Sequence, residues 1–108
     1  MKKFLVLYHS PISNQEQMKK ATPELMKAAM DGWMKWAGKA GKALVDMGAP
    51  LGDSGWIKGT PRVGHLGGYS MVQTDSIDAA KKLFDGHPHF ELPGASIQVV
   101  EIMPTPGK

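Results

Sequence analysis

Residues 3–9 read KFLVLYH, a run of large apolar and aromatic side chains that Ser10-Pro11 brings to an end. Such a run predicts a β-strand that stops before the proline. Alternate side chains of a strand point to opposite faces of the sheet, so Val6 and Leu7 give this strand two apolar faces. The rest of the chain must therefore provide a cover for both faces.

A helix is predicted after this strand, from Thr22-Pro23-Glu24 to about Ala40, ending at Gly41, because threonine caps a helix and proline suits its first position. We expect residues 13–20, which are polar and show no clear period, to form a connecting loop or an irregular turn. Apolar residues in the helix follow the spacing of a buried stripe: Met26, Ala29, Met30, Trp33, Trp36, Ala37 and Ala40. The pattern indicates an amphipathic helix that lies on an apolar sheet.

Further strands are predicted over residues 43–51, 68–74 and 96–103, with a second helix over 77–84. Residues 52–68 are rich in Gly, Ser, Asp, Thr and Pro, which indicates either a long β-excursion or a functional loop. The order β-α-β-β-α-β predicts one α+β domain over residues 1–108. This is the ferredoxin-like plan, in which two helices cover one face of a four-stranded antiparallel sheet.

The second face of that sheet is apolar as well, as the adjacent pairs Val6-Leu7, Met71-Val72 and Val99-Val100 show. No predicted segment of the chain remains to cover it. The simplest cover is a second copy of the same chain. We therefore expect a homodimer that forms through the open sheet face.

The composition excludes several classes of protein. The 108 residues include no cysteine, which rules out disulfide scaffolds, thiol catalysis and cysteine-bound zinc. The formal charge is +3 and Arg62 is the sole arginine, which argues against a nucleic-acid partner. The apolar run 4–8 is too short for a signal peptide or a membrane span, so we expect a soluble cytoplasmic protein that does not bind membranes. Neither the Walker phosphate-binding pattern nor the dinucleotide-binding fingerprint occurs in the sequence, and we expect no cofactor.

Several short segments of the sequence resemble those of the YCII-related family, which includes proteins named for a DGPF motif. They are KFLVLYH, the Thr22-Pro23-Glu24 helix start with its two tryptophans, Gly67-Gly68-Tyr69-Ser70, the segment 75–80 (DSIDAA) and the final SIQVVEIMP. The resemblance implies a dimeric α+β barrel whose cavities open near the end of the first strand, where Tyr8 and His9 lie. It also implies a His and Asp pair in founding members. Here the first predicted helix has no histidine, and His87-Pro88-His89 stands where the family has Asp-Pro-Tyr.

His87 and His89 flank a proline that holds the residue before it extended, so both imidazoles can project from one side of a turn. They are candidates for acid–base catalysis or substrate binding. The alternatives are ordinary loop polarity and a metal site. A third ligand at suitable spacing is missing, so no metal is expected.

Asp46 is a further catalytic candidate, since a carboxylate between Val45 and Met47 of a strand is either buried and basic or placed at an edge facing water. The other candidates form a substrate-binding set: Tyr8, His9, Trp33, Trp36, Arg62 and His65. In this set the tryptophans would line a pocket for a flat apolar ligand, or simply pack in the core. Arg62 would hold an anionic group.

Two classes of function stay open. In the first, the chain is a small-molecule binder or a cofactor-free acid–base enzyme, with a pocket between the first predicted helix and the sheet, and a small hydrophobic or anionic ligand. In the second, it is a non-catalytic dimerisation or accessory module whose histidines are incidental. Whether the chain is an enzyme does not follow from its residues.

Overall fold

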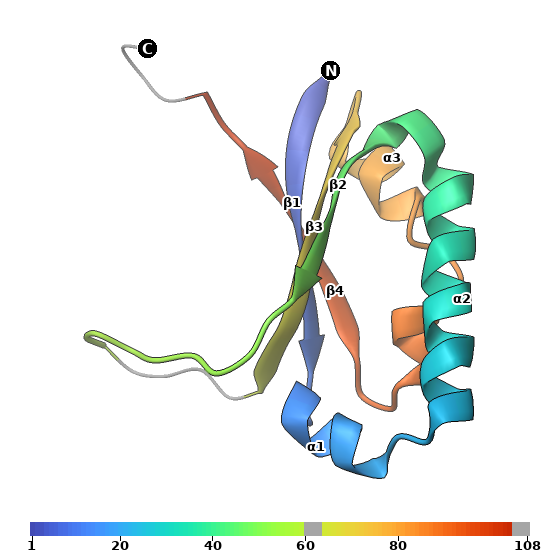
Figure 1. Cartoon of the computed structure of the whole chain (residues 1–108). Helices are drawn as coiled ribbons and strands as arrows, with labels where there is room; N and C mark the ends of the chain where they lie inside the picture. Colours follow the sequence, from blue (N-terminus) through green and yellow to red (C-terminus); the bar gives the residue numbers. More distant parts are fainter. Residues whose placement is uncertain (60–63, 105–108) are drawn as a thin grey trace.

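The computed structural model describes residues 1–59 and 64–104 and has an α+β architecture with one open sheet (Figure 1). The strands are β1 (Lys2–Ser10), β2 (Leu44–Pro50), β3 (His65–Thr74) and β4 (Ser96–Ile102), in the spatial order β2-β3-β1-β4 with antiparallel neighbours. The helices are α1 (Asn14–Lys20), α2 (Pro23–Ala40) and α3 (Ile77–Lys82), with 3₁₀ turns η1 (Gly41–Ala43) and η2 (Pro88–Glu91). This arrangement is compatible with a ferredoxin-like fold.

The chain order of the predicted strands and of both predicted helices is confirmed, but the expected loop over residues 13–20 is wrong. Residues Asn14–Lys20 form α1, and the Ser13 side chain caps it by accepting a hydrogen bond from the Glu16 backbone N–H at 3.2 Å. This helix buries none of its residues. It therefore has no apolar period by which the sequence could reveal it.

The predicted ends of α2 are confirmed. Thr22 caps the helix by accepting from the Leu25 backbone N–H at 3.2 Å, and Gly41 ends it with a positive φ of 58°. The buried stripe is correct only in its second half, where Trp36 and Ala40 are buried, whereas Met26 and Met30 are 52% and 60% exposed. Spacing reports which side chains share one side of a helix, but not how far along that side another element covers it.

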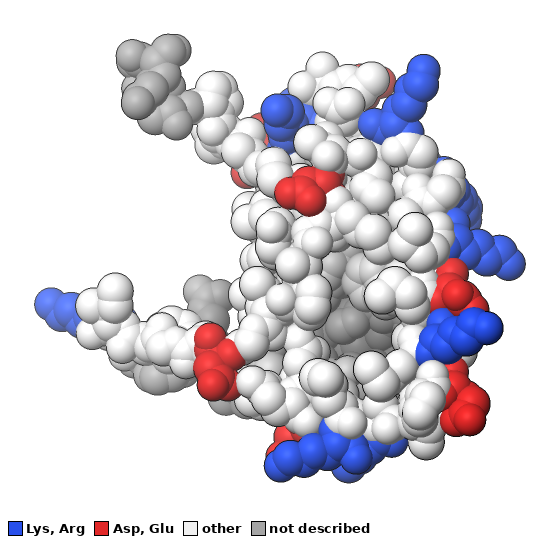
Figure 2. Space-filling model, viewed as in Figure 1, with Lys and Arg blue, Asp and Glu red and all other residues white. Residues whose placement is uncertain are grey.

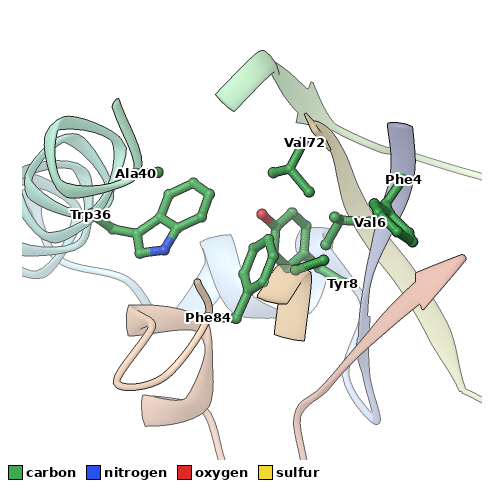
Figure 3. Packing of buried hydrophobic residues seen from close by; sticks show 8 residues of the cluster. Phe4, Val6, Tyr8, Trp36, Ala40, Val72 and Phe84 are labelled. Atoms are coloured by element: carbon green, nitrogen blue, oxygen red, sulfur yellow. The ribbon is translucent and has the colours of Figure 1, made fainter. Parts of the chain in front are cut away.

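The core lies between the sheet and the helical layer. It consists of eight buried residues from both layers: Phe4, Val6, Tyr8, Trp36, Ala40, Val72, Ala80 and Phe84 (Figure 3). The Trp36 indole Nε1 donates to the carbonyl oxygen of Leu83 at 2.7 Å, which satisfies its polar atom and ties α2 to the end of α3.

The second sheet face is apolar, as the sequence predicts, and the helices leave it uncovered (Figure 1). Leu5 of β1 lies opposite Met71 of β3 and Val100 of β4 on this side, one residue out of step with buried Val6. We call this surface the open face; its apolar members are half-buried or exposed: Leu5, Leu7, Tyr69, Met71, Val100 and Ile102.

Candidate functional site

Six ring-bearing side chains meet where α2 and η2 approach the end of β1. This histidine cluster is made of Tyr8, Trp33, Trp36, Phe84, His87 and His89. Four of them are almost completely buried, whereas Trp33 and His89 are half-buried. Any molecule that reaches the cluster from solvent must therefore meet Trp33 and His89 first.

The His-Pro-His turn is fixed against α2 through its proline. A Cβ atom at Gly32 of α2 would lie 3.4 Å from Pro88 Cβ, so the missing side chain lets the turn approach the helix closely. His87 is extended, with φ −61° and ψ 139°, as a residue before proline should be. As the sequence predicts, both imidazoles lie on one side of the turn, with ring centroids 5.4 Å (His87) and 5.3 Å (His89) from that of Tyr8.

His87 is not an ordinary polar residue of a loop, because only 1% of it is exposed. Its ring stacks on Tyr8 and meets the indoles of Trp33 and Trp36 edge-on, with centroids 4.4 and 4.5 Å away. Burial, helped by the nearby His89, lowers the pKa of His87 from 6.5 to about 4. The imidazole is therefore neutral at physiological pH.

The hydrogen bonds of His87 also fix its tautomer. Nδ1 accepts a hydrogen bond from the His89 backbone N–H at 3.0 Å, so the proton of the neutral ring is on Nε2. That Nε2 is fully buried and has no hydrogen-bond partner among the described residues. The indole rings beside it are at best weak acceptors. His87 thus offers an unused N–H donor, and a donor with this tautomer cannot act as a base through the same atom.

His89 has the complementary property. Its Nε2 lies 2.9 Å from the carbonyl oxygen of His9, and because a carbonyl only accepts, Nε2 carries the proton. The Nδ1 of neutral His89 then holds a free lone pair. Of the two turn histidines, His89 is the one whose second ring nitrogen accepts no hydrogen bond from the described residues.

The Tyr8 hydroxyl is turned away from the histidines. It donates to Ser70 Oγ at 2.8 Å, and Ser70 in turn donates to the carbonyl oxygen of Met47 at 2.7 Å. Burial raises the pKa of Tyr8 to about 12, although the bond to Ser70 opposes the shift. Tyr8 therefore contributes the face of its ring to the cluster, and its phenol links β1 to β3 and β2.

The structure does not bring Asp46 together with the histidines. Asp46 lies opposite Met71 and so belongs to the open face of the sheet, on the exposed edge strand β2. Its Oδ1 accepts from the backbone N–H of Gly48 at 2.8 Å, within a register shift of that strand. The solvent-facing edge position considered from the sequence is the one observed.

The remaining predicted site residues also lie elsewhere. His9 points to the open face, where its Nε2 lies 2.9 Å from Gln98 Oε1. His65 is exposed at the first position of β3, opposite Ser10. Arg62 lies outside the described residues.

Sequence reasoning missed two residues that shape the cluster. Ser70 holds the Tyr8 hydroxyl, and Phe84 places its ring centroid 5.6 Å from that of His87. Phe84 belongs to the predicted second helix, but nothing local in the sequence shows that its ring faces a histidine three residues later. Gly32 offers a local signal, since a glycine within a helix indicates that another segment comes close, here the Pro88 ring.

The space-filling view shows the surface hollowed between α2 and the sheet, and charged side chains gathered mainly on the helical side of the molecule (Figure 2). In the described parts of the chain, no three His, Asp or Glu side chains are grouped so that they could hold a metal ion. In those same ranges, no helix has both the length and the apolar character needed to cross a bilayer.

Comparison with protein-family models finds no family that matches the chain, and comparison with curated proteins finds no similar sequence.

Proposed function

We propose that this chain binds a small, flat, largely apolar molecule with an oxygen acceptor, held between α2 and the sheet against the histidine cluster. The bound molecule would replace part of the Trp33 contact and would present its oxygen to His87. Aromatic walls suit a flat apolar body, and few convergent polar atoms orient it. No cofactor is needed for this role.

The observation that carries the proposal is the unused Nε2–H of His87. A buried donor without a partner costs about 1–3 kcal/mol, and such a group in a native structure calls for an explanation. A ligand oxygen at hydrogen-bond distance would remove that cost. The ring cluster, the tautomer and the half-buried Trp33 all agree with a site that is completed by a ligand.

The same geometry supports cofactor-free acid–base chemistry. His89 Nδ1 would take a proton from the carbon next to a carbonyl group, and the electron pair left behind would move to the carbonyl oxygen. The His87 Nε2–H would stabilise the negative charge that develops there. The roles are distinct because the two histidines hold their protons differently.

Binding is tested by isothermal titration with three probes of similar size: acetophenone, benzoate and toluene. We expect acetophenone or benzoate to bind at least tenfold more tightly than toluene, which has no oxygen to accept from His87. The variant Lys39→Gln, on an exposed position of α2, should bind as the natural chain does. Equal binding of all three probes, or of none, would contradict the proposal.

The role of His89 is tested by His89→Gln. A glutamine amide can still donate to the carbonyl oxygen of His9, but it has no basic nitrogen. We expect the natural chain to accelerate the exchange of the acetophenone methyl protons with deuterated water. The variant should bind acetophenone normally, but exchange should fall to the uncatalysed rate. Exchange that persists in the variant would exclude His89 as the base.

A second copy of the chain is our proposed partner, and a non-catalytic dimerisation module is the alternative function. The apolar open face favours it, because monomers rarely leave such a continuous surface in water. The resemblance to YCII-related proteins supports the same pairing, since it implies a dimeric α+β barrel. Sedimentation equilibrium should give twice the chain mass of 11.7 kDa. The cytoplasmic location stays a prediction.

A further inference from the structure

Residues 51–59 leave the end of β2 as an arm that projects from the body of the molecule. Figure 1 shows this arm on the side of the sheet opposite to the helices, the side of the open face. The last described residues after β4 extend toward the same side, so that the outline of the molecule is concave there (Figure 2). The arm therefore points away from the hydrophobic core of its own chain.

The root of the arm is held firmly by α1. Asn14 Nδ2 donates to the carbonyl oxygens of Leu51 and Gly67, both at 2.8 Å, and so joins the two sides of the root. Leu51 N–H also donates to Gly67 O at 3.0 Å, and Gln15 Nε2 donates to Asp53 Oδ1 at 2.7 Å. These bonds set the direction in which the arm leaves the sheet.

Beyond this root the arm carries two large apolar side chains that are exposed to water. Trp56 is 55% exposed and Ile57 is 105% exposed. Burying side chains of this kind against another molecule is favourable, and the isolated chain forgoes that gain. An arm with a fixed root and an apolar end is suited to contact another molecule.

The chain is less compact than a single domain of its length usually is, which agrees with a fold that a second chain completes. Its radius of gyration is 15.0 Å, whereas a compact chain of this length is expected to have about 13 Å. From Leu51 to Ile57 an extended chain reaches about 20 Å. Two stacked sheets lie only about 10 Å apart. The arm is thus long enough to pass the sheet of a copy stacked on the open face and to reach that copy's edge.

We infer that the arm clasps a second copy of this chain. Trp56 and Ile57 of each chain pack against the surface of the partner chain. This inference rests on the proposed homodimer and adds to it the element that locks the pair. A two-fold dimer gives each chain the same contact, so two arms are buried at once. The occupant is a second copy because the open face and the apolar end of the arm, Trp56 and Ile57, lie on the same side of the sheet.

The substitution Ile57→Asp tests the inference, with Met30→Asp as the matched control. Met30 is 60% exposed on α2, which lies on the other side of the sheet from the open face. The control therefore adds the same charge to another exposed apolar position. We expect the dissociation constant of the dimer, measured by sedimentation velocity, to rise at least tenfold for Ile57→Asp and to stay unchanged for Met30→Asp.

The absence of cysteine makes a direct contact test simple, because a single introduced thiol is unique. Ile57→Cys labelled with benzophenone maleimide should give a covalent dimer on irradiation, and Met30→Cys should not. A natural chain that is dimeric while Ile57→Asp dimerises equally tightly and Ile57→Cys crosslinks only within one chain would overturn the arm alone. A monomeric natural chain would overturn both the arm and the homodimer.

Discussion

At the scale of single residues, His87 decides what the site can do. Its burial among rings of Tyr8, Trp33, Trp36 and Phe84 lowers its pKa to about 4, and its bond from the His89 backbone places the proton on Nε2. A neutral donor of this kind can bind a ligand oxygen but cannot take up a proton at that atom. The different roles of His87 and His89 thus follow from their positions in the fold and not from the His-Pro-His sequence alone.

The lowered pKa predicts a specific dependence of stability on pH. In the unfolded chain His87 titrates near 6.5, but in the folded chain only near 4, so between these values the unfolded state binds more protons. Stability should be fully present above about pH 6.5 and fall as the pH drops toward 4. The loss from this one group is about 3 kcal/mol.

Urea unfolding at several pH values and one protein concentration measures this effect by comparing the natural chain with His87→Gln. We expect the free energy of unfolding of the variant to depend less steeply on pH over this window. His65→Gln, which removes an exposed histidine, should keep the slope of the natural chain. The same slope in all three proteins would mean that His87 is not buried in the neutral form.

The sequence could single out the His-Pro-His turn but not the state of its rings. The chemistry of the residue types and the effect of Pro88 on its neighbours are local. The protonation of His87 depends on β1, on α2 and on the end of α3, whose side chains meet it only in the folded chain. A carboxylate within a strand is a reasonable catalytic candidate, but the face on which Asp46 lies depends on a register shift in β2 that no local pattern reveals.

At the scale of elements, two glycines predict opposite responses to alanine. At Gly48 in β2, φ is +78° and a Cβ atom would lie 1.7 Å from the Tyr69 carbonyl oxygen, so Gly48→Ala must distort the β2–β3 pairing. At Gly38 in α2 nothing lies within 4 Å of that position, so Gly38→Ala only improves helix propensity.

Thermal unfolding followed by circular dichroism should separate the two variants clearly. We expect Gly48→Ala to lose about 2 kcal/mol or more, and Gly38→Ala to gain about 0.5–1 kcal/mol. In a domain of this size these changes correspond to a fall of roughly 10 °C and a rise of a few degrees in Tm. A Gly48→Ala chain as stable as the natural one would show that β2 does not have this backbone.

The elements that the sequence could predict are those with an apolar period and a recognisable end. The helix that ends at Gly41 has both, and the strand over 3–9 has a continuous apolar run that ends at Ser10-Pro11. Helix α1 has neither a buried residue nor a glycine stop, because its polar side chains serve the root of the arm instead of the core. Its function in the fold is carried by long-range hydrogen bonds, which a local pattern does not contain.

At the scale of the whole molecule, the alternation of apolar side chains on both sides of the strands was the most informative pattern. It predicted that helices would cover one face only, and the open face is the result. The direction of the arm could not be predicted, since it follows from bonds between α1 and residues more than 30 positions away. Two chains that share this face would give a small protein a larger core.

The central claim is that the Nε2–H of His87 is the donor that a ligand completes. It is tested most directly by a long-range ¹H–¹⁵N spectrum of the histidine side chains, recorded with and without acetophenone. We predict that His87 is in the Nε2–H tautomer throughout and that its Nε2 and attached proton shift as the probe binds. A His87 signal that shows the other tautomer, or that stays unchanged while acetophenone binds, would contradict the claim.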